Sequence, residues 1–309
     1  MINNIKFHFT IADLENLSGV KIPTIRMWEK RYALLSPERT DTNIRLYDID
    51  DLRKLLNIVY LTNSGSKISK VASLSASELN NRVKESYQKK NSEALLVNDF
   101  IISSLTFDND LFHKTYNTLI EKYSFSEMFV KAFIPLLERI GILWQTSTLT
   151  PANEHFISYH ILRKLYTNID IAEKLTRKTK RSRLYILFLP HNEIHELGLL
   201  YTYYELLLRE MNVVYLGQSV EINEMKCFAN PDSQNVFISN FTVAPESRKT
   251  EEYLENAYDS LLKNTNNQFL LSCNKVAASK EYQDKGIHLF SRIPDLIESV
   301  DSNLIEENL

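Results

Sequence analysis

The spacing of apolar side chains changes along this chain of 309 residues and limits the folds that it can adopt. Between residue 92 and about residue 175, apolar residues recur every three or four positions, which is the period of amphipathic helices. Four such segments with short connections predict an antiparallel helical bundle. From residue 184 onward, short β-rich runs alternate with amphipathic segments, which predicts a parallel sheet with helices on both faces.

The chain is therefore predicted to be a multi-domain protein of the α plus α/β class. We expect an N-terminal domain in residues 1–80, the helical bundle in 92–175 and a Rossmann-like, flavodoxin-like domain in 182–309. A charged run without apolar periodicity, residues 174–183, is the expected linker. The expected strands of the last domain are 184–190, 213–217, 236–241, 269–273 and 287–290.

Composition excludes several classes of protein. The chain has six glycines, and their wide spacing rules out a GxGxxG dinucleotide loop and a GxxxxGK phosphate loop. The formal net charge is -3, so any surface that binds nucleic acid must be local. The two cysteines lie in no CxxC or Cys/His cluster, which argues against structural zinc and favours a reducing, cytoplasmic setting. Neither a secretory signal nor a membrane-spanning run is expected.

Residues 10–31 have the pattern of a helix, a tight turn and a second helix. Thr10 can cap the first helix, Gly19 can supply the turn, and Pro23 suits the start of the second helix. This arrangement places a second helix in the major groove of DNA. Residues 21–45 contain six basic and three acidic side chains, a local positive excess that DNA binding requires. On charge alone, a solvated helix face remains the alternative.

Residues 20–55 closely resemble the winged helix-turn-helix of the MerR family of transcription regulators, with a TIRxWEKRY segment at 24–32. The resemblance implies a dimer bound to a near-palindromic operator in double-stranded DNA. Trp28 is expected in the core, because a bulky indole is best buried. Cysteine-based sensing of metals or oxidants is disfavoured, since residues 76–130 contain no cysteine. The predicted DNA-binding residues are Lys21, Thr24, Arg26, Lys30, Arg31, Tyr32, Arg39, Asn43, Arg45 and Tyr47.

A histidine-containing loop, residues 191–198, follows the first strand of the predicted sheet. Ligands of open parallel sheets bind at the carboxyl ends of the strands, where this loop is expected. Glu193 stands two positions before His195, and such a carboxylate can hold one ring nitrogen while the other binds a metal. Gly198 would let a ligand approach the backbone. From the residues alone, an ordinary hydrogen-bonded loop histidine is the alternative.

The motif Glu193-x-His195-x-x-Gly198 resembles the Asp-x-His-x-x-Gly signature of cobalamin-binding domains, in which the histidine is the lower cobalt ligand. Ser239 stands where that family has a Ser-x-Leu motif beside the nucleotide tail. The resemblance implies cobalamin as the cofactor, with adenosylcobalamin as one form. It makes His195 the cobalt ligand and places Glu193, Gly198 and Ser239 around the cofactor.

A second pattern lies in the helical segment. Trp144 is followed after nine residues by Glu154 and His155, which is similar to the Trp-x9-Glu-His pattern of light-responsive, cobalamin-dependent MerR-type repressors, the CarA/CarH/LitR group. The resemblance implies that Trp144 covers the upper corrin face and that Glu154 and His155 lie near the adenosyl group. The alternative is that Glu154 only interacts with the dipole of a helix opened by Pro151, and that His155 packs.

Three departures from these patterns are visible. Glu193 replaces the usual Asp but can still orient the histidine. Gln145 follows Trp144 where the photoreceptor repressors have a second histidine, so their light product could not form with that residue. Residues 272–275 read Ser-Cys-Asn-Lys where cobalamin binders carry a Gly-Gly pair against the nucleotide tail. Side chains there would occupy space that the tail needs, so binding is weakened, altered toward another corrinoid or lost.

Together these patterns predict a DNA-binding transcription regulator, most simply a repressor, and not an enzyme. Its C-terminal module would bind cobalamin, or derive from a cobalamin binder, and couple ligand state to a dimer or tetramer equilibrium. The alternative is a cofactor-independent regulator that a protein partner controls through the same module. A corrinoid-dependent methyltransferase component is disfavoured, because no separate catalytic domain is left in the chain.

Overall fold

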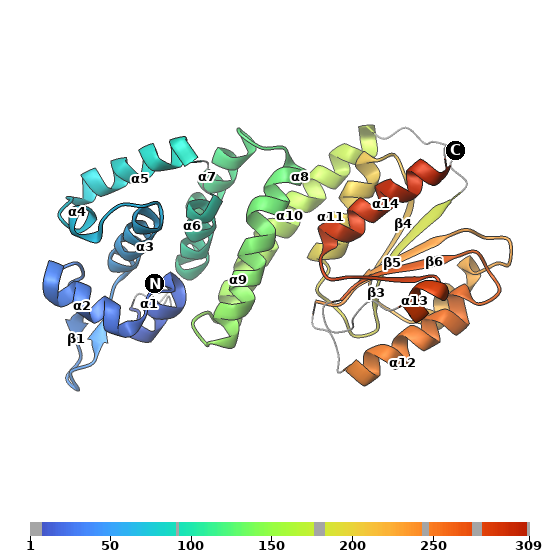
Figure 1. Cartoon of the computed structure of the whole chain (residues 1–309), viewed down its shortest axis with the longest axis horizontal. Coiled ribbons are helices and arrows are strands. Elements are labelled where there is room, and N and C mark those ends of the chain that lie inside the picture. Colours follow the sequence, from blue (N-terminus) through green and yellow to red (C-terminus); the bar gives the residue numbers. More distant parts are fainter. Residues whose placement is uncertain (1–7, 91–92, 176–182, 243–246, 274–279, 308–309) are drawn as a thin grey trace. The chain divides into compact units, whose positions relative to one another are not determined.

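The computed structural model describes residues 8–90, 93–175, 183–242, 247–273 and 280–307, and the chain forms two compact units (Figure 1). The first comprises residues 1–160 and the second residues 161–309. The division falls within helix α10 (Pro151–Leu175), so the last bundle helix contributes to both units. The division into three domains stays a prediction, and residues 176–182 of the expected linker lie outside the described residues. Within the described ranges, no helix is long and apolar enough to cross a membrane.

The first unit begins with a helix-turn-helix. The hydroxyl of Thr10 accepts a hydrogen bond from the amide of Asp13, whose carboxylate accepts one from the amide of Thr10. Gly19 follows at φ +74°, a left-handed conformation that glycine adopts without strain. An antiparallel pair of short strands forms a wing, and three helices follow it. The elements are α1 (Ile11–Ser18), α2 (Ile22–Tyr32), β1 (Glu38–Arg39), β2 (Arg45–Leu46), α3 (Ile49–Asn63), α4 (Ile68–Ala72) and α5 (Ala76–Lys90).

The described residues of the predicted bundle form helices with short connections, around a core of packed aromatic rings. Phe100 lies 5.0 Å from Phe112 and 5.5 Å from Phe133, measured between ring centroids. One helix contains a π-helical turn, η1 (Phe129–Phe133), because Pro135 has no N–H to donate to the carbonyl one turn earlier. The remaining elements are α6 (Glu93–Thr106), α7 (Asn109–Ile120), α8 (Phe125–Met128), α9 (Ile134–Gln145) and α10.

One carboxyl of α6 makes the stability of this unit depend on pH. Burial raises the pKa of Asp99 to about 6, although Arg53 and Lys114 oppose the shift. Because the folded state binds this proton more tightly than the unfolded chain, stability falls as pH rises from about 4 to about 6. Asp99→Asn stays neutral, so we expect it to raise the free energy of unfolding by about 1–3 kcal/mol at neutral pH. Urea titrations of the wild type and Asp99→Asn at neutral pH and at about pH 4 measure this difference in the free energy of unfolding. An increase at about pH 4 as large as that at neutral pH would contradict the prediction.

The second unit contains a five-stranded parallel sheet in the order β4-β3-β5-β6-β7. The predicted parallel sheet is confirmed, and each of the five predicted β runs overlaps one strand. The next strand in the chain, β4, lies on one side of β3, and the following strand, β5, lies on the other side. The direction of the strand order therefore reverses between β3 and β5, which is where ligands bind in such sheets. The strands are β3 (Leu184–Pro190), β4 (Asn212–Val220), β5 (Val236–Asn240), β6 (Gln268–Ser272) and β7 (Ile287–Phe290).

Helices cover both faces of this sheet (Figure 1). One face packs Ile186, Phe188 and Phe237 against α12 and η3, and the other packs Leu187 and Ile238 against α11 and α14. Burial of both faces explains why the strand sequences are almost continuously apolar. The covering elements are α11 (Leu197–Leu208), η2 (Ile222–Phe228), α12 (Ser247–Ala257), η3 (Tyr258–Leu262), α13 (Lys280–Asp284) and α14 (Ile293–Glu307).

Candidate functional site

Helix α2 presents a basic outer face. Ile25 is fully buried and fixes the inner face of the helix against the rest of the helix-turn-helix. Thr24 and Tyr32 are half-buried at the edge of the outer face, and the Arg31 guanidinium lies 5.4 Å from the Tyr32 ring centroid. Trp28, expected in the core, is only partly buried. The exposed basic residues of this helix and its N-cap are Lys21, Arg26, Lys30 and Arg31.

The wing carries two of the predicted DNA-binding residues on its exposed tip. Arg39 donates a hydrogen bond to the side-chain carbonyl of Asn43, and both side chains are exposed. Asn43 has φ +65°, so it holds the left-handed position of the turn between β1 and β2. The hydroxyl of Thr40 accepts from the amide of Ile44 at 3.0 Å and closes the turn. The wing therefore presents a basic tip of defined shape.

The structure corrects the prediction for Tyr47. This side chain has no exposed surface, and its hydroxyl donates to Glu29 of α2. Burial, followed by the hydrogen bond to Glu29, raises the pKa of Tyr47 well above its usual range. Arg45 binds the other oxygen of Glu29, with 3.1 Å between its Nε and that oxygen. Tyr47 and Arg45 thus fix the wing against α2, and Tyr47 has no surface with which to contact DNA.

In the second unit, Glu193 organises the loop after β3. This carboxylate is buried, and one oxygen accepts from the amides of Ile194 and His195 at 2.9 and 3.0 Å. The other oxygen accepts from the amide of Thr242, beyond the end of β5, at 3.2 Å. Glu193 therefore joins the carboxyl ends of β3 and β5 at the reversal point of the sheet.

The imidazole of His195 is held by the same carboxylate. Its Nδ1 lies 2.6 Å from the first oxygen of Glu193, and the side chain is half exposed. When Nδ1 donates to a carboxylate, Nε2 carries the lone pair, so Nε2 can bind a metal ion. The structure thus brings together the Glu–His pair that the sequence singles out, in an arrangement in which Nε2 could bind a metal ion.

The end of β5 lies in the same region. Ser239 and Asn240 are both buried, and the carbonyl oxygen of the Asn240 side chain has no hydrogen-bond donor among the described residues. A buried polar atom without a partner is expensive, so this oxygen fits a site in which a ligand supplies the donor. The hydroxyl of Ser239 lies beside that of Tyr253 on α12, which is also buried.

A cavity of about 170 Å³ opens next to these residues, between the β3 loop and α12. Phe241 and Tyr253 line it, and His191 and Glu221 form an ion pair on its wall with 3.1 Å between Nδ1 and the carboxylate oxygen. Sites that enclose small molecules have volumes of roughly 300–1,000 Å³. The cavity as it stands holds only part of a large cofactor.

Gly198 has a different environment from the one expected. A Cβ at this position would lie 2.4 Å from the terminal carbon of Ile293 on α14 and 3.6 Å from the Asn240 amide. The glycine therefore permits close packing of α11 against Ile293 of α14. The prediction that it lets a ligand reach the backbone is corrected, because Ile293 already fills that space.

The bundle residues of the second pattern are exposed in the first unit. Trp144, near the end of α9, is 55% exposed, which is unusual for an indole and leaves a large apolar surface available to a ligand. Glu154, in the first turn of α10, accepts from the hydroxyl of Ser158 at 2.6 Å. His155 is exposed beside it, with 3.9 Å between its Nε2 and the Glu154 carboxylate, so it does not pack.

The strand end that lacks the Gly-Gly pair is described only in part. Ser272 and Cys273 are buried, and the amide of Cys273 donates to the carbonyl of Phe290 at 2.8 Å. Asn274 and Lys275 lie outside the described residues.

The sequence did not point to three residues that shape these sites, Glu29, Thr242 and Asn240. Glu29 could have been found from the sequence, because it is an acidic residue within a basic helix. Thr242 could not, because it acts through its backbone amide, which every residue except proline has.

Comparisons with known proteins find two matching domains. Residues 9–78 match the family model of the MerR helix-turn-helix family of regulatory proteins, and residues 96–166 match that of the B12 binding domain. The chain is 27% identical to the HTH-type transcriptional repressor CarH of Myxococcus xanthus over 247 residues, 77% of this chain and 79% of CarH. It is 34% identical to the HTH-type transcriptional regulator MlrA of Escherichia coli (strain K12) over 70 residues, 23% of this chain and 29% of MlrA.

Among solved structures, the monomethylamine corrinoid protein of Methanosarcina barkeri is similar in fold. The TM-score is 0.51 at 11% identity, over 69% of this chain and 98% of that chain. At that identity the likeness concerns the fold alone. The curated relatives are transcription regulators, not enzymes. The chain is therefore a DNA-binding transcription regulator, with a helix-turn-helix similar to that of the MerR family in residues 9–78 and a helical segment similar to the B12 binding domain in residues 96–166.

Proposed function

We propose that this regulator is a repressor whose affinity for its operator depends on a corrinoid bound through His195. The observation that carries the proposal is the Glu193–His195 pair at the sheet reversal point, in a chain whose α2 presents an exposed basic face. The match of residues 96–166 to the B12 binding domain supports it. CarH, a repressor by name, supports the sign of regulation.

The residues present fit the cobalt side of such a cofactor. Nε2 of His195 would bind the cobalt, and Glu193 would fix the tautomer and the ring orientation. A bound cobalamin would supply a cobalt centre whose ligation depends on the state of the cofactor. Ser239 and Asn240 would lie beside the nucleotide tail, and the resemblance in the bundle adds Trp144, Glu154 and His155 as cofactor contacts.

Regulation would follow from linkage. A ligand that binds one arrangement of subunits more tightly shifts the equilibrium between dimer and tetramer, and by reciprocity operator binding shifts ligand affinity. Two DNA-binding domains per operator would be needed for a near-palindromic site, so assembly state controls repression. The proposal is thus of a cytoplasmic homo-oligomer. The alternative is that a protein partner controls the regulator. In that case repression should not depend on His195.

The decisive experiment compares His195→Ala with His191→Ala in the full chain. Both histidines lie in the β3 loop and both pair with a glutamate, His195 with Glu193 and His191 with Glu221. We expect the wild type and His191→Ala to retain added cobalamin through gel filtration, seen as corrin absorbance. His195→Ala should bind at least about tenfold more weakly, because loss of metal-site partners typically lowers affinity by about 10–100-fold. A wild-type protein that retains no cobalamin contradicts the proposal.

A further inference from the structure

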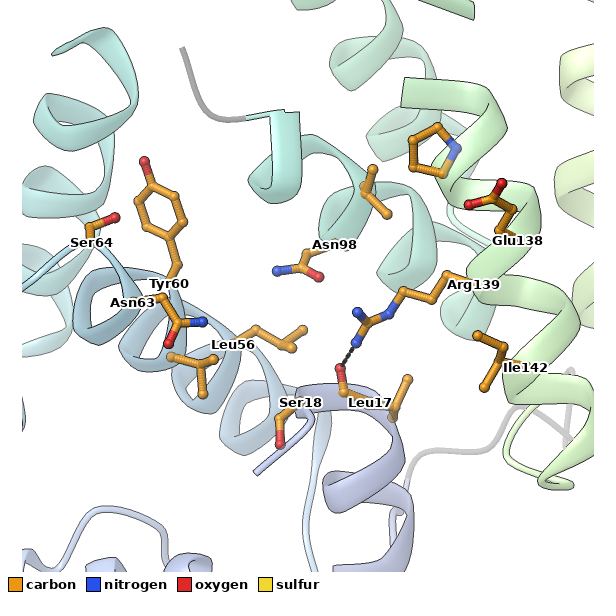
Figure 2. A pocket seen from close by; sticks show the side chains of 13 residues that line it. Leu17, Ser18, Leu56, Tyr60, Asn63, Ser64, Asn98, Glu138, Arg139 and Ile142 are labelled. Carbon is orange, nitrogen blue, oxygen red and sulfur yellow. Dashed lines mark hydrogen bonds between the residues drawn. The ribbon is translucent and has the colours of Figure 1, made fainter. Parts of the chain in front are cut away.

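A groove of about 570 Å³ lies within the first unit, between helices of the DNA-binding region and helices α6 and α9 of the bundle (Figure 2). Its volume falls in the range of roughly 300–1,000 Å³ that is typical of small-molecule sites. Its lining includes none of the residues proposed to bind the corrinoid. The apolar part of its wall consists of Leu17, Leu56, Val59, Val97, Pro135 and Ile142.

Arg139 of α9 brings a positive charge into this groove. One terminal nitrogen of its guanidinium donates to the backbone carbonyl of Leu17, near the end of α1 (Figure 2). Its Nε is buried and has no hydrogen-bond partner, and no ion pair with Arg139 exists within the described ranges. Burial lowers the pKa of Arg139, as expected for a charge without a counter-ion. Glu138 lines the same groove but is exposed and makes no ion pair with Arg139 there.

Other polar side chains line the groove besides Arg139. Tyr60 on α3 is 7% exposed, and its hydroxyl, which has no hydrogen-bond partner among the described residues, points away from Arg139 (Figure 2). The amide side chains of Asn63 and Asn98 line the same space (Figure 2). The amides can donate or accept, whereas the guanidinium only donates and carries the positive charge. An anionic group is the complement of this set.

We infer that the groove binds a small organic acid, with a carboxylate on an apolar body. The carboxylate pairs with the guanidinium of Arg139, and the apolar body covers Leu56, Val97 and Ile142. Because Arg139 also holds the carbonyl of Leu17, an occupant contacts both the bundle and the first helix of the helix-turn-helix. Binding of the acid is therefore coupled to the position of the DNA-binding helices, and operator DNA changes the affinity for the acid by the same factor.

The test uses benzoate as the probe and benzamide as its neutral counterpart of the same shape. Isothermal titration of the full chain, without DNA or cobalamin, measures the affinity of each, so the result does not depend on the proposed function. We expect benzoate to bind with a Kd of about 1 mM or tighter, and benzamide at least about tenfold more weakly. Equal affinities, or no binding of benzoate, overturn the inference.

Two variants separate the site from the fold. Arg139→Gln removes the guanidinium and should abolish benzoate binding, whereas the control Arg82→Gln, an exposed arginine of α5 paired with Glu85, should not change it. If Arg139→Gln fails to fold, the comparison of benzoate with benzamide on the wild type decides, and equal affinities contradict the inference.

Discussion

Replacing Arg26 and Lys30 together by alanine is expected to abolish operator binding at moderate salt while the protein stays folded. Both side chains are exposed on α2, and neither takes part in an ion pair within the described part of the chain. A contact to a base edge contributes about 1–3 kcal/mol, and each lost phosphate contact lowers the salt dependence by about one unit. The double variant should therefore bind at least about 30-fold more weakly than the wild type.

The measurement is a binding titration at several salt concentrations, on DNA selected by the wild-type protein from a random pool. Arg163→Ala with Lys174→Ala is the matched control, because it removes two exposed basic side chains from α10, outside the DNA-binding domain. We expect the control to retain wild-type affinity and the wild-type salt slope. Equal losses in the two double variants would mean that charge alone, and not the α2 face, determines binding.

Periodicity predicted the elements well where one physical signal dominated. The Thr10 cap and the Gly19 turn set the ends of α1, and both act within a few residues, so the sequence alone reveals them. The strands of the second unit were equally clear, because burial on both faces demands continuous apolar runs. The π-helical turn before Pro135 was not predicted. Proline leaves one backbone carbonyl without an N–H donor, and the sequence does not show how the helix adjusts to that loss.

The candidate sites were predictable only where a motif carries them. Glu193 and His195 stand two positions apart, so their contact follows from local geometry. The environments of Tyr47 and Gly198 depend on Glu29 and Ile293, which are 18 and 95 positions away in the sequence. Contacts at such separations are set by tertiary packing, which no local pattern encodes. The Arg139 groove is of the same kind, because its polar groups come from three separate helices.

The stability of the second unit provides a test of the corrin site that needs no cofactor. Glu193 is buried and accepts hydrogen bonds from three backbone amides and from His195. Glu193→Ala leaves those donors without their acceptor at the junction of β3 and β5. A buried hydrogen-bond donor left without its acceptor typically destabilises a protein by about 1–3 kcal/mol. We expect a loss of this size in the free energy of unfolding of the second unit.

Glu221→Ala is the matched control, because Glu221 also pairs with a loop histidine but is about half exposed, at 56%. Exposed ion pairs contribute at most about 1 kcal/mol, so this variant should unfold close to the wild type. Urea denaturation followed by far-UV circular dichroism compares the two variants in the absence of cobalamin. A small loss in Glu193→Ala would show that the loop after β3 is not held by this carboxylate. His195 would then have no fixed orientation before the cofactor binds, and the preorganised cobalt ligand on which the proposed function depends would be absent.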